Sequence, residues 1–384
     1  MPGRSFKIAR IAGIPVGVNP WWLLIVVLFT WILGDSYYPS VVPGISAAAS
    51  YGLGLLSILL LFASVLAHEF GHAIVARRHG IEVEEIDLWL LGGVSRLKGH
   101  PEEAGDELRY AAAGPLVTAV IAAVFGLIAV ALPGSAPATL RAVVDYQVYT
   151  NVALLFFNLV PAFPLDGGRI ARALLWRRRH DLAAATRTAA GVGRVFGWLM
   201  IVLGGFSFLE GAAAGVVLAL IGGFVVMAAG AEEAQEQVFE ALAGVSASEV
   251  MSAPAITVGA EATLDDAERA FARHRGSVLP VVDAEGRVVG LLSLEQLERL
   301  LRAGRQIGRV GEIADPDPEI LVTEDEDIVK LFERPAFART GHAVVVTTDH
   351  RPVGIVSKTD IERMLRLGRL RGGGRGTDTL VHDH

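Results

Sequence analysis

The chain has 384 residues, of which 52% are hydrophobic, and its mean hydropathy is +0.47. The apolar residues lie mainly before about residue 230 and the charged residues after it, which indicates a membrane part followed by a soluble part. A formal charge of -7 without a sustained basic face excludes a nucleic-acid-binding protein, and the absence of cysteine excludes disulfides and thiolate metal sites. Any metal must therefore be held by histidine, carboxylate or carbonyl groups.

Apolar segments in the first part predict about six transmembrane helices. The first, 19–33, begins and ends with tryptophans that favour the membrane interface, and we expect it to be retained rather than cleaved as a signal peptide. The other predicted spans lie at about 51–76, 110–132, 142–163, 194–209 and 211–229. The last two are short and nearly continuous, so they are predicted to form either a tight hairpin or one long broken helix.

Basic residues predict the orientation of these spans, because their excess marks cytoplasmic loops. The stretch 34–50 has none, whereas Arg77 and Arg78 follow the second span and many arginines between Arg169 and Arg194 follow the fourth. Both termini are therefore expected in the cytoplasm. In that topology the second and fourth spans run inward, and their cytoplasmic ends lie at one depth.

The end of the second span carries the motif HEFGH. His68 and His72 stand four residues apart, so on a helix they share one face and can bind one metal ion, with Glu69 beside them to take a proton from bound water. Helical rise places His68 about 25 Å along from Tyr51, inside or just beneath a hydrocarbon core about 30 Å thick. The alternative is a chance arrangement of interfacial residues, and a third ligand distinguishes the two.

The fourth span ends in NLVPAFPLDGGR, which supplies that ligand. Pro161 and Pro164 are expected to break the helix, and Gly167 and Gly168 allow close backbone approach around Asp166. Taken alone, the Asp-Gly-Gly segment fits a turn at a helix end. Combined with HEFGH at the same predicted depth, it completes a site of two histidines and one carboxylate with a position left for water.

These motifs, together with LLGGVSRL (90–97) and AAAGPLVTAV (111–120), resemble the site-2 proteases, a family of zinc intramembrane metalloproteases. The resemblance implies a membrane-associated β-hairpin between them, and 81–97 does partly alternate apolar and polar residues as a strand would. It implies that Glu69 is the general base and that Asn158 positions the substrate or stabilises the oxyanion. It also implies the ligands of one Zn²⁺ ion: His68, His72 and Asp166.

The mechanism expected from this resemblance is regulated intramembrane proteolysis. A transmembrane helix must unwind locally before water can attack its peptide bonds, and an exposed strand edge in 81–97 would hold the extended segment. The alternative is that the hairpin only covers the site. The expected substrate is a membrane-tethered protein such as an anti-sigma factor, in a bacterial plasma membrane. The alternative function is a membrane transporter or channel regulated by the soluble part, with the polar cluster along an ion path.

The soluble part contains a weak internal repeat. Residues 277–301 match 341–365, and each copy reads as a strand, a turn, a second strand and a helix. This resembles a tandem pair of CBS domains, which implies a site for an adenine nucleotide (AMP, ADP or ATP) and a contact for a homodimer. Ser357 and Asp360 match the ribose-contacting positions, whereas the first copy has Ser293 but Gln296 in place of the acid. The alternative is a pair used only for packing or dimerisation.

The predicted fold is thus a polytopic α-helical membrane protein with a β-hairpin, followed by a cytosolic α/β tandem CBS pair. The predicted divisions are a transmembrane zinc metalloprotease domain, a linker helix, two CBS domains and a disordered tail, at 1–230, 231–245, 246–304, 305–367 and 368–384.

Overall fold

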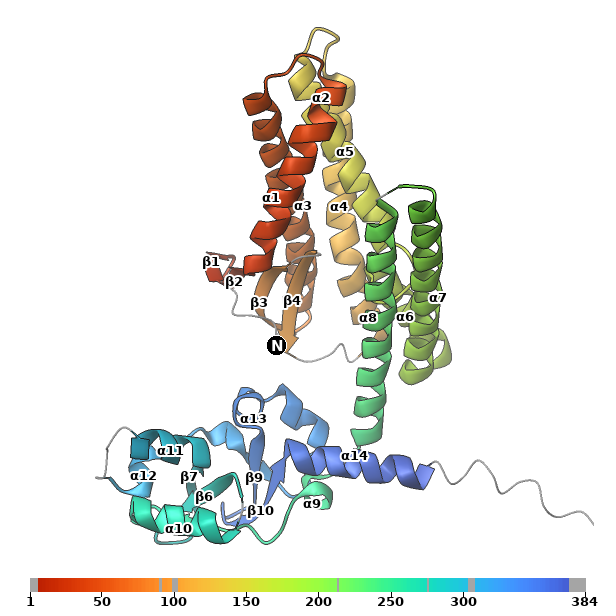
Figure 1. Cartoon of the computed structure of the whole chain (residues 1–384). Helices are drawn as coiled ribbons and strands as arrows, with labels where there is room; N and C mark the ends of the chain where they lie inside the picture. Colours follow the sequence, from red (N-terminus) through yellow and green to blue (C-terminus); the bar gives the residue numbers. More distant parts are fainter. Residues whose placement is uncertain are drawn as a thin grey trace, which may run out of the picture. The chain divides into compact units, whose positions relative to one another are not determined.

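The computed structural model of the chain describes residues 6–89, 92–98, 103–212, 214–274, 276–302 and 308–372. The chain divides into two compact units, Met1–Glu236 and Gln237–His384 (Figure 1). The helix α8 (Ala214–Leu242) contains the division, so most of the predicted linker helix is a continuation of the last long helix of the first unit.

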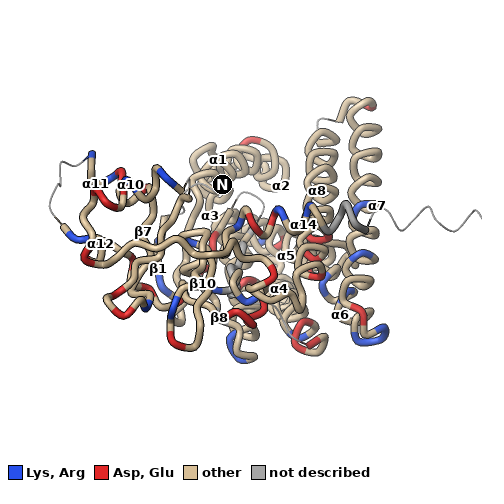
Figure 2. The backbone as a smooth tube through the Cα atoms, turned by 90° about the horizontal axis from the view of Figure 1, so that it is seen from below, with Lys and Arg blue, Asp and Glu red and all other residues tan. Residues whose placement is uncertain are grey.

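Five helical segments of the first unit are long and apolar enough to cross a membrane. The first, Pro20–Val41, consists of α1 (Pro20–Ile32), a π-helical turn η1 (Leu33–Tyr37) and α2 (Tyr38–Val41). The others are α3 (Ala47–Arg78), α4 (Ala104–Ala131), α7 (Leu182–Leu209) and α8. In Figure 2 the long helices are mainly tan, with charged residues toward their ends. A predominantly apolar multi-pass membrane unit is therefore confirmed.

The helices α7 and α8 correct the predicted fifth and sixth spans. They are two separate helices of 28 and 29 residues, and α7 begins at Leu182 rather than near 194. The hydropathy pattern missed the first turns of α7 because Arg187 and Arg194 interrupt the apolar run. The alternative of a single broken helix is wrong.

The predicted fourth span is α5 (Ala138–Asn158), a helix of 21 residues that is not among the five apolar candidates. Its polar residues face inward: the buried Gln147 donates a hydrogen bond to the Ser57 carbonyl oxygen at 2.8 Å, and the buried Asn151 donates one to the Gln147 carbonyl oxygen at 2.9 Å. Figure 1 shows α5 running antiparallel to α4 within the bundle. A total of six spans, with α5 among them, stays a prediction.

A four-stranded sheet lies beside α3, in the order β1-β2-β3-β4. Its strands are β1 (Phe6–Ile11), β2 (Ile14–Val18), β3 (Glu82–Trp89) and β4 (Gly92–Lys98). Strands β3 and β4 pair antiparallel over the predicted hairpin region, and β2 joins β3 in parallel. The sequence analysis did not predict β1 and β2. Ile14 and Ile86 pack in one core with Ala73 and Ala76 of α3, which holds the sheet against the helix that carries HEFGH.

The short helix α6 (Asp166–Arg179) follows α5 after the turn 159–165. Its first glycines lie directly on that turn, because a Cβ atom on Gly168 would lie 2.5 Å from the carbonyl carbon of Ala162. The predicted role of Gly167 and Gly168, close backbone approach around Asp166, therefore agrees with the packing.

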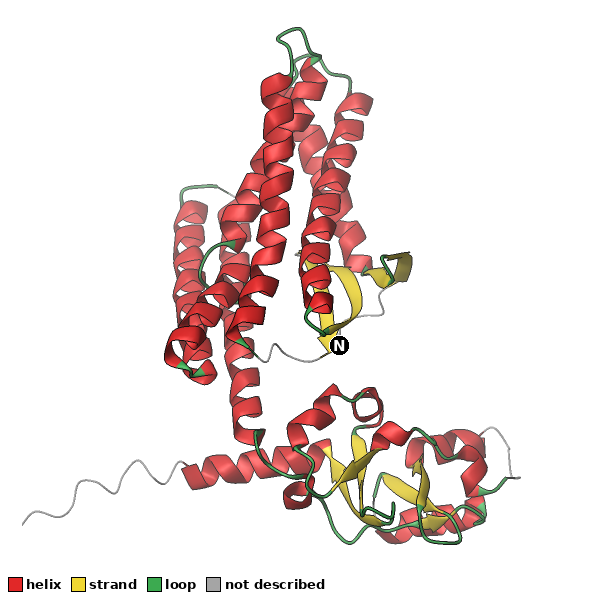
Figure 3. Cartoon of the chain, turned by 180° about the vertical axis from the view of Figure 1, so that it is seen from behind, coloured by secondary structure: helices red, strands yellow, loops and turns green. Residues whose placement is uncertain are grey.

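The second unit contains two three-stranded sheets of the same design (Figure 3). One consists of β5 (Val258–Gly259), β6 (Val278–Val282) and β7 (Val288–Ser293), with α10 (Leu264–His274) and α11 (Leu294–Arg302). The other consists of β8 (Leu321–Thr323), β9 (His342–Val346) and β10 (Pro352–Ser357), with α13 (Pro335–Thr340) and α14 (Lys358–Gly372). In each sheet the first strand pairs parallel with the second, and the second pairs antiparallel with the third.

The two copies interlock through the short segments that precede them. Helix α9 (Ala247–Val250) packs into the core of the second copy with Val345 and Val356, whereas Val310 of α12 (Val310–Ile313) packs into the core of the first. The short 3-10 helices η2 (Pro318–Ile320) and η3 (Ile328–Glu333) lie in the second copy. The internal repeat predicted from the sequence is thus a structural repeat, and each copy is completed by residues that precede the other.

Candidate metal centre

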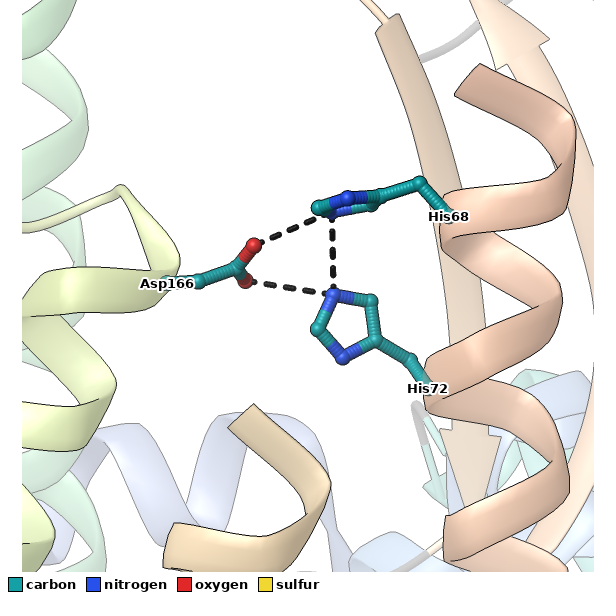
Figure 4. A group of neighbouring side chains, drawn as sticks. All are labelled: His68, His72 and Asp166. Atoms are coloured by element: carbon teal, nitrogen blue, oxygen red, sulfur yellow. Dashed lines mark hydrogen bonds and ion pairs between the residues drawn. The ribbon is translucent and has the colours of Figure 1, made fainter. Parts of the chain in front are cut away.

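His68 and His72 lie one turn apart on α3 and point toward Asp166, the first residue of α6 (Figure 4). Nε2 of His68 lies 3.0 Å from Oδ2 of Asp166, Nε2 of His72 lies 3.3 Å from Oδ1, and the two Nε2 atoms lie 3.1 Å apart. The histidines are 5% and 3% exposed, so the cluster is shielded from solvent. The structure therefore brings together the three residues predicted as ligands, from segments almost a hundred residues apart.

The partners of the other ring nitrogens determine which way the histidines present their lone pairs. Nδ1 of His72 lies 2.8 Å from the carbonyl oxygen of Tyr110, which can only accept, so Nδ1 carries the proton and Nε2 is left with a lone pair. Nδ1 of His68 lies 2.9 Å from Oγ1 of Thr118, a hydroxyl that can accept in the same way. Both histidines then direct electron pairs at each other and at the carboxylate.

Such an arrangement fits a cation. Oδ2 of Asp166 is buried and accepts no hydrogen bond from the described residues, and two facing lone pairs 3.1 Å apart repel unless something positive lies between them. Bonds of about 2.0 to 2.2 Å to a tetrahedral zinc ion place its ligand atoms roughly 3.3 to 3.6 Å apart, close to the separations of 3.0 to 3.3 Å found here. The donor set of two imidazoles and one carboxylate is also one that zinc prefers.

Helix α4 supplies the supports of this cluster. Tyr110, Gly114 and Thr118 recur every four residues and so share one face. A Cβ atom on Gly114 would collide with Nε2 of both histidines, so only glycine leaves this space open. Gly114 and Thr118 belong to AAAGPLVTAV, a motif that supports the family resemblance but predicts no role for single residues. A backbone carbonyl such as that of Tyr110 leaves no residue-type signal, whereas Gly114 and Thr118 lie inside the quoted motif.

Glu69 packs against the edge strand β4. It follows His68 on α3, and a Cβ atom on Gly93 of β4 would lie 2.8 Å from its Cδ and 3.0 Å from its Oε1. The glycine thus lets the edge strand β4 approach the carboxylate closely. Asn158 is half-buried at the last turn of α5. Its predicted part in substrate positioning stays a prediction.

Comparison of the chain with known proteins identifies its family. Peptidase family M50 matches residues 56–140 and 124–203, and the CBS domain family matches 247–303 and 310–366. "Putative zinc metalloprotease Rip3" of Mycobacterium tuberculosis is 38% identical over 370 residues, which cover 95% of this chain and 94% of that protein. The chain belongs to peptidase family M50.

Further M50 relatives extend over nearly the whole chain. "Zinc metalloprotease MJ0392" of Methanocaldococcus jannaschii is 27% identical over 373 residues, which cover 96% of this chain and 98% of that protein. Among solved structures, the site-2 protease from the same organism is 29% identical, covers 60% of this chain and 95% of that chain, and gives a TM-score of 0.41. The predicted metalloprotease with tandem CBS domains is confirmed, and the predicted alternative of a transporter or channel is not supported.

In the CBS part of this M50 peptidase, Ser357 and Asp360 bond to each other. Oγ of Ser357 donates to Oδ2 of Asp360 at 2.5 Å, the Ser357 amide donates to the same oxygen, and the Asp360 amide donates to Oγ of Ser357. These bonds form a capping box at the start of α14. Oδ1 of Asp360 accepts from Oγ of Ser252 at 3.0 Å.

The first CBS copy has the same cap with a different residue. Oε1 of Gln296 accepts from the Ser293 amide at 2.9 Å and from its hydroxyl at 3.0 Å, and the Gln296 amide donates to Oγ of Ser293. Gln296 therefore replaces Asp360 in capping without loss of a bond.

Asp360 also lines a cavity of about 360 Å³, together with Glu249, Val250, Met251, Ser252, Arg363, Met364 and Leu367.

Proposed function

We propose that this M50 peptidase uses one Zn²⁺ ion, held by His68, His72 and Asp166, to hydrolyse a peptide bond in or near the transmembrane segment of another membrane protein. The convergence of two buried imidazoles and one largely buried carboxylate carries the proposal. Zinc bound there supplies a Lewis acid that polarises a carbonyl and makes a bound water more acidic. The position of Asp166 at a helix N-terminus further favours its ionised form.

Glu69 is the proposed general base. It takes a proton from the attacking water as oxygen bonds to the carbonyl carbon, and it returns the proton to the amide nitrogen as the C–N bond breaks. The products are a carboxylate and an amine, and the protein is regenerated. The close approach of Gly93 to Glu69 supports this role, because it brings a strand that can hold a peptide next to the base.

The edge strand β4 is the proposed site for the unwound substrate. Among the described residues β4 pairs only with β3, so its other edge offers backbone groups to an extended peptide. Asn158 is the proposed partner of the substrate or of the oxyanion. A single-span, membrane-tethered regulator such as an anti-sigma factor is the proposed substrate class, since a buried site beside apolar helices suits a segment that arrives from the bilayer.

The CBS pair is the proposed regulatory part. We propose that an adenine nucleotide binds near Ser357 and Asp360, and the adjacent cavity supports this site. We also propose that the CBS pair can form a homodimer.

For the membrane unit, we propose six spans in a bacterial plasma membrane with the termini and CBS pair in the cytoplasm. The alternating directions of α1, α3, α4, α5, α7 and α8 in Figure 1 support an even number of crossings.

The first experiment measures zinc in the purified, detergent-solubilised full chain beside a His68→Ala, His72→Ala double variant. We expect about one zinc per chain in the wild type and a loss of it in the variant. Cleavage of a panel of single-span membrane proteins, co-reconstituted in vesicles, then tests the reaction. A wild type that takes up no zinc after reconstitution would contradict the proposal, as would zinc retained by the double variant.

A further inference from the structure

The face of α4 that supports the histidines continues one turn further, to Glu107. Tyr110, Gly114 and Thr118 occupy this face opposite α3, and Glu107 precedes Tyr110 by three residues. Glu107 is 1% exposed, and its partner is Arg172 of α6, which is 8% exposed. Since α6 begins with Asp166, this ion pair joins α4 to the helix that carries the third residue of the metal centre.

Arg172 contacts Glu107 of α4, Phe163 of the turn before Asp166 and, at 3.8 Å from Nη1 to Oε2, Glu236 of α8. Its Nε donates to Oε1 of Glu107 at 2.7 Å, and Nη2 donates to the same oxygen. Its guanidinium carbon lies 5.1 Å from the centre of the Phe163 ring, within the range of a cation–π contact. Arg172, six residues after Asp166 on α6, therefore links that helix to α4 and to the turn three residues before Asp166.

The carboxylate of Glu107 depends strongly on this contact. Its Oε2 is buried and accepts no hydrogen bond from the described residues. Phe163, whose ring lies under the guanidinium, is completely buried against Ala189, Ala190 and Ala229. The Arg172 guanidinium is thus held by two buried neighbours, Glu107 and Phe163, and this planar group has little freedom to move.

We propose that Arg172 is a positioning residue for Asp166. Through Thr118, Tyr110 and the Glu107–Arg172 pair, α4 then orients all three ligands of the metal centre. This inference rests on the zinc site proposed above. Residues that orient metal ligands affect metal affinity even though they do not touch the metal.

Removal of Arg172 alone gives an ambiguous result, because it leaves a buried charge on Glu107 and destabilises the unit for that reason. The test therefore replaces both members of the buried pair at once, as Arg172→Met with Glu107→Leu, since apolar residues of similar volume commonly restore stability. The more distant carboxylate of Glu236 is partly exposed and stays in contact with its surroundings. Zinc affinity is measured by competition with a chromophoric chelator, and the unfolding midpoint of the metal-free protein is measured in the same detergent. The second variant is Arg172→Lys, which keeps the positive charge but lacks the planar guanidinium and its paired N–H donors.

A matched control comes from another ion pair of the same unit. Arg194 of α7 pairs with Glu233 of α8, and within the described part of the chain neither has a hydrogen bond or ion pair with the metal centre or the 159–165 turn. The control variant is Arg194→Met with Glu233→Leu. We expect it to bind zinc as the wild type does.

The expected result is a double Arg172 and Glu107 variant that unfolds near the wild-type midpoint but binds zinc about 10 to 100 times more weakly. Arg172→Lys is expected to show a loss in the same direction and of smaller size. Wild-type zinc affinity in both Arg172 variants would overturn the inference, and so would an equal loss in the control pair. A wild type without zinc would overturn the zinc proposal and this inference together.

Discussion

Two clusters of polar residues in this chain were predicted as ligand sites from motifs, and the structure gives them opposite character. In the membrane unit, His68, His72 and Asp166 leave their electron pairs unsatisfied and directed at one point. In the soluble unit, Ser357 and Asp360 satisfy each other in a helix cap. The difference teaches that a motif indicates a ligand more strongly when its groups cannot be satisfied without one.

The largest effect that separates the two clusters is expected from Glu69→Gln. The amide cannot accept the proton from water, so cleavage should fall by at least about 100-fold, the lower end of the effect of a general base, while zinc content is unchanged. Cleavage of a reconstituted substrate and zinc per chain are measured on the same sample. A fully active Glu69→Gln protein would rule out the proposed mechanism.

Asp166→Ala is expected to act on binding as well as on chemistry. With one of three ligands lost, zinc affinity should fall by more than the roughly 10 to 100-fold that supporting residues contribute, and cleavage should fall with it. Zinc titration against a chelator measures the first effect. Asp360→Ala, which changes an aspartate of the soluble unit, is the matched control and should leave zinc affinity at the wild-type value. An equal loss of zinc affinity in both variants would mean that the loss follows from a general decrease in stability.

Much of the metal centre could be predicted because its chemistry requires particular residue types at fixed spacings. The spacing of four from His68 to His72 defines a helix face, and the proline and glycine residues around Asp166 define where its helix must begin. The supports on α4 could not be found in this way. The contact to His72 comes from a backbone carbonyl, which any residue type could supply. Gly114 matters because a side chain at its position would collide with the histidines, and this is evident only once α4 is packed on α3.

Fold elements were predicted well where hydropathy dominates and poorly where it does not. Helix α7 begins earlier than its apolar run, since a long-range ion pair with Glu233 of α8 accommodates Arg194 within the helix. The strands β1 and β2 were missed because β2 pairs with a strand that is distant in the sequence: Val16 pairs with Ile86, seventy residues away. The CBS repeat was visible because both copies place apolar strands and a polar turn in the same order.

Thr118→Val tests whether orientation of His68 matters to the metal centre. The change keeps the volume but removes the oxygen that accepts from Nδ1, so zinc affinity should fall by about 10-fold or more. Thr186→Val is the matched control, because Oγ1 of Thr186 is also buried and has no hydrogen-bond partner among the described residues. Equal zinc affinities in the two variants would show that the Thr118 hydroxyl does not orient the ligand.

The smallest expected effects lie in the soluble unit, where Asp360→Ala and Gln296→Ala remove equivalent caps from α14 and α11. Each should lower the free energy of unfolding of this unit by about 0.5 to 2 kcal/mol, the usual range for a lost N-terminal cap. If an adenine nucleotide binds near Ser357 and Asp360, AMP or ATP should raise the unfolding midpoint of the full-length wild type and of Gln296→Ala, but not of Asp360→Ala. Equal midpoints with and without nucleotide in all three proteins would leave the cap as the whole role of Asp360, and the resemblance at this position would then reflect helix geometry rather than ligand binding.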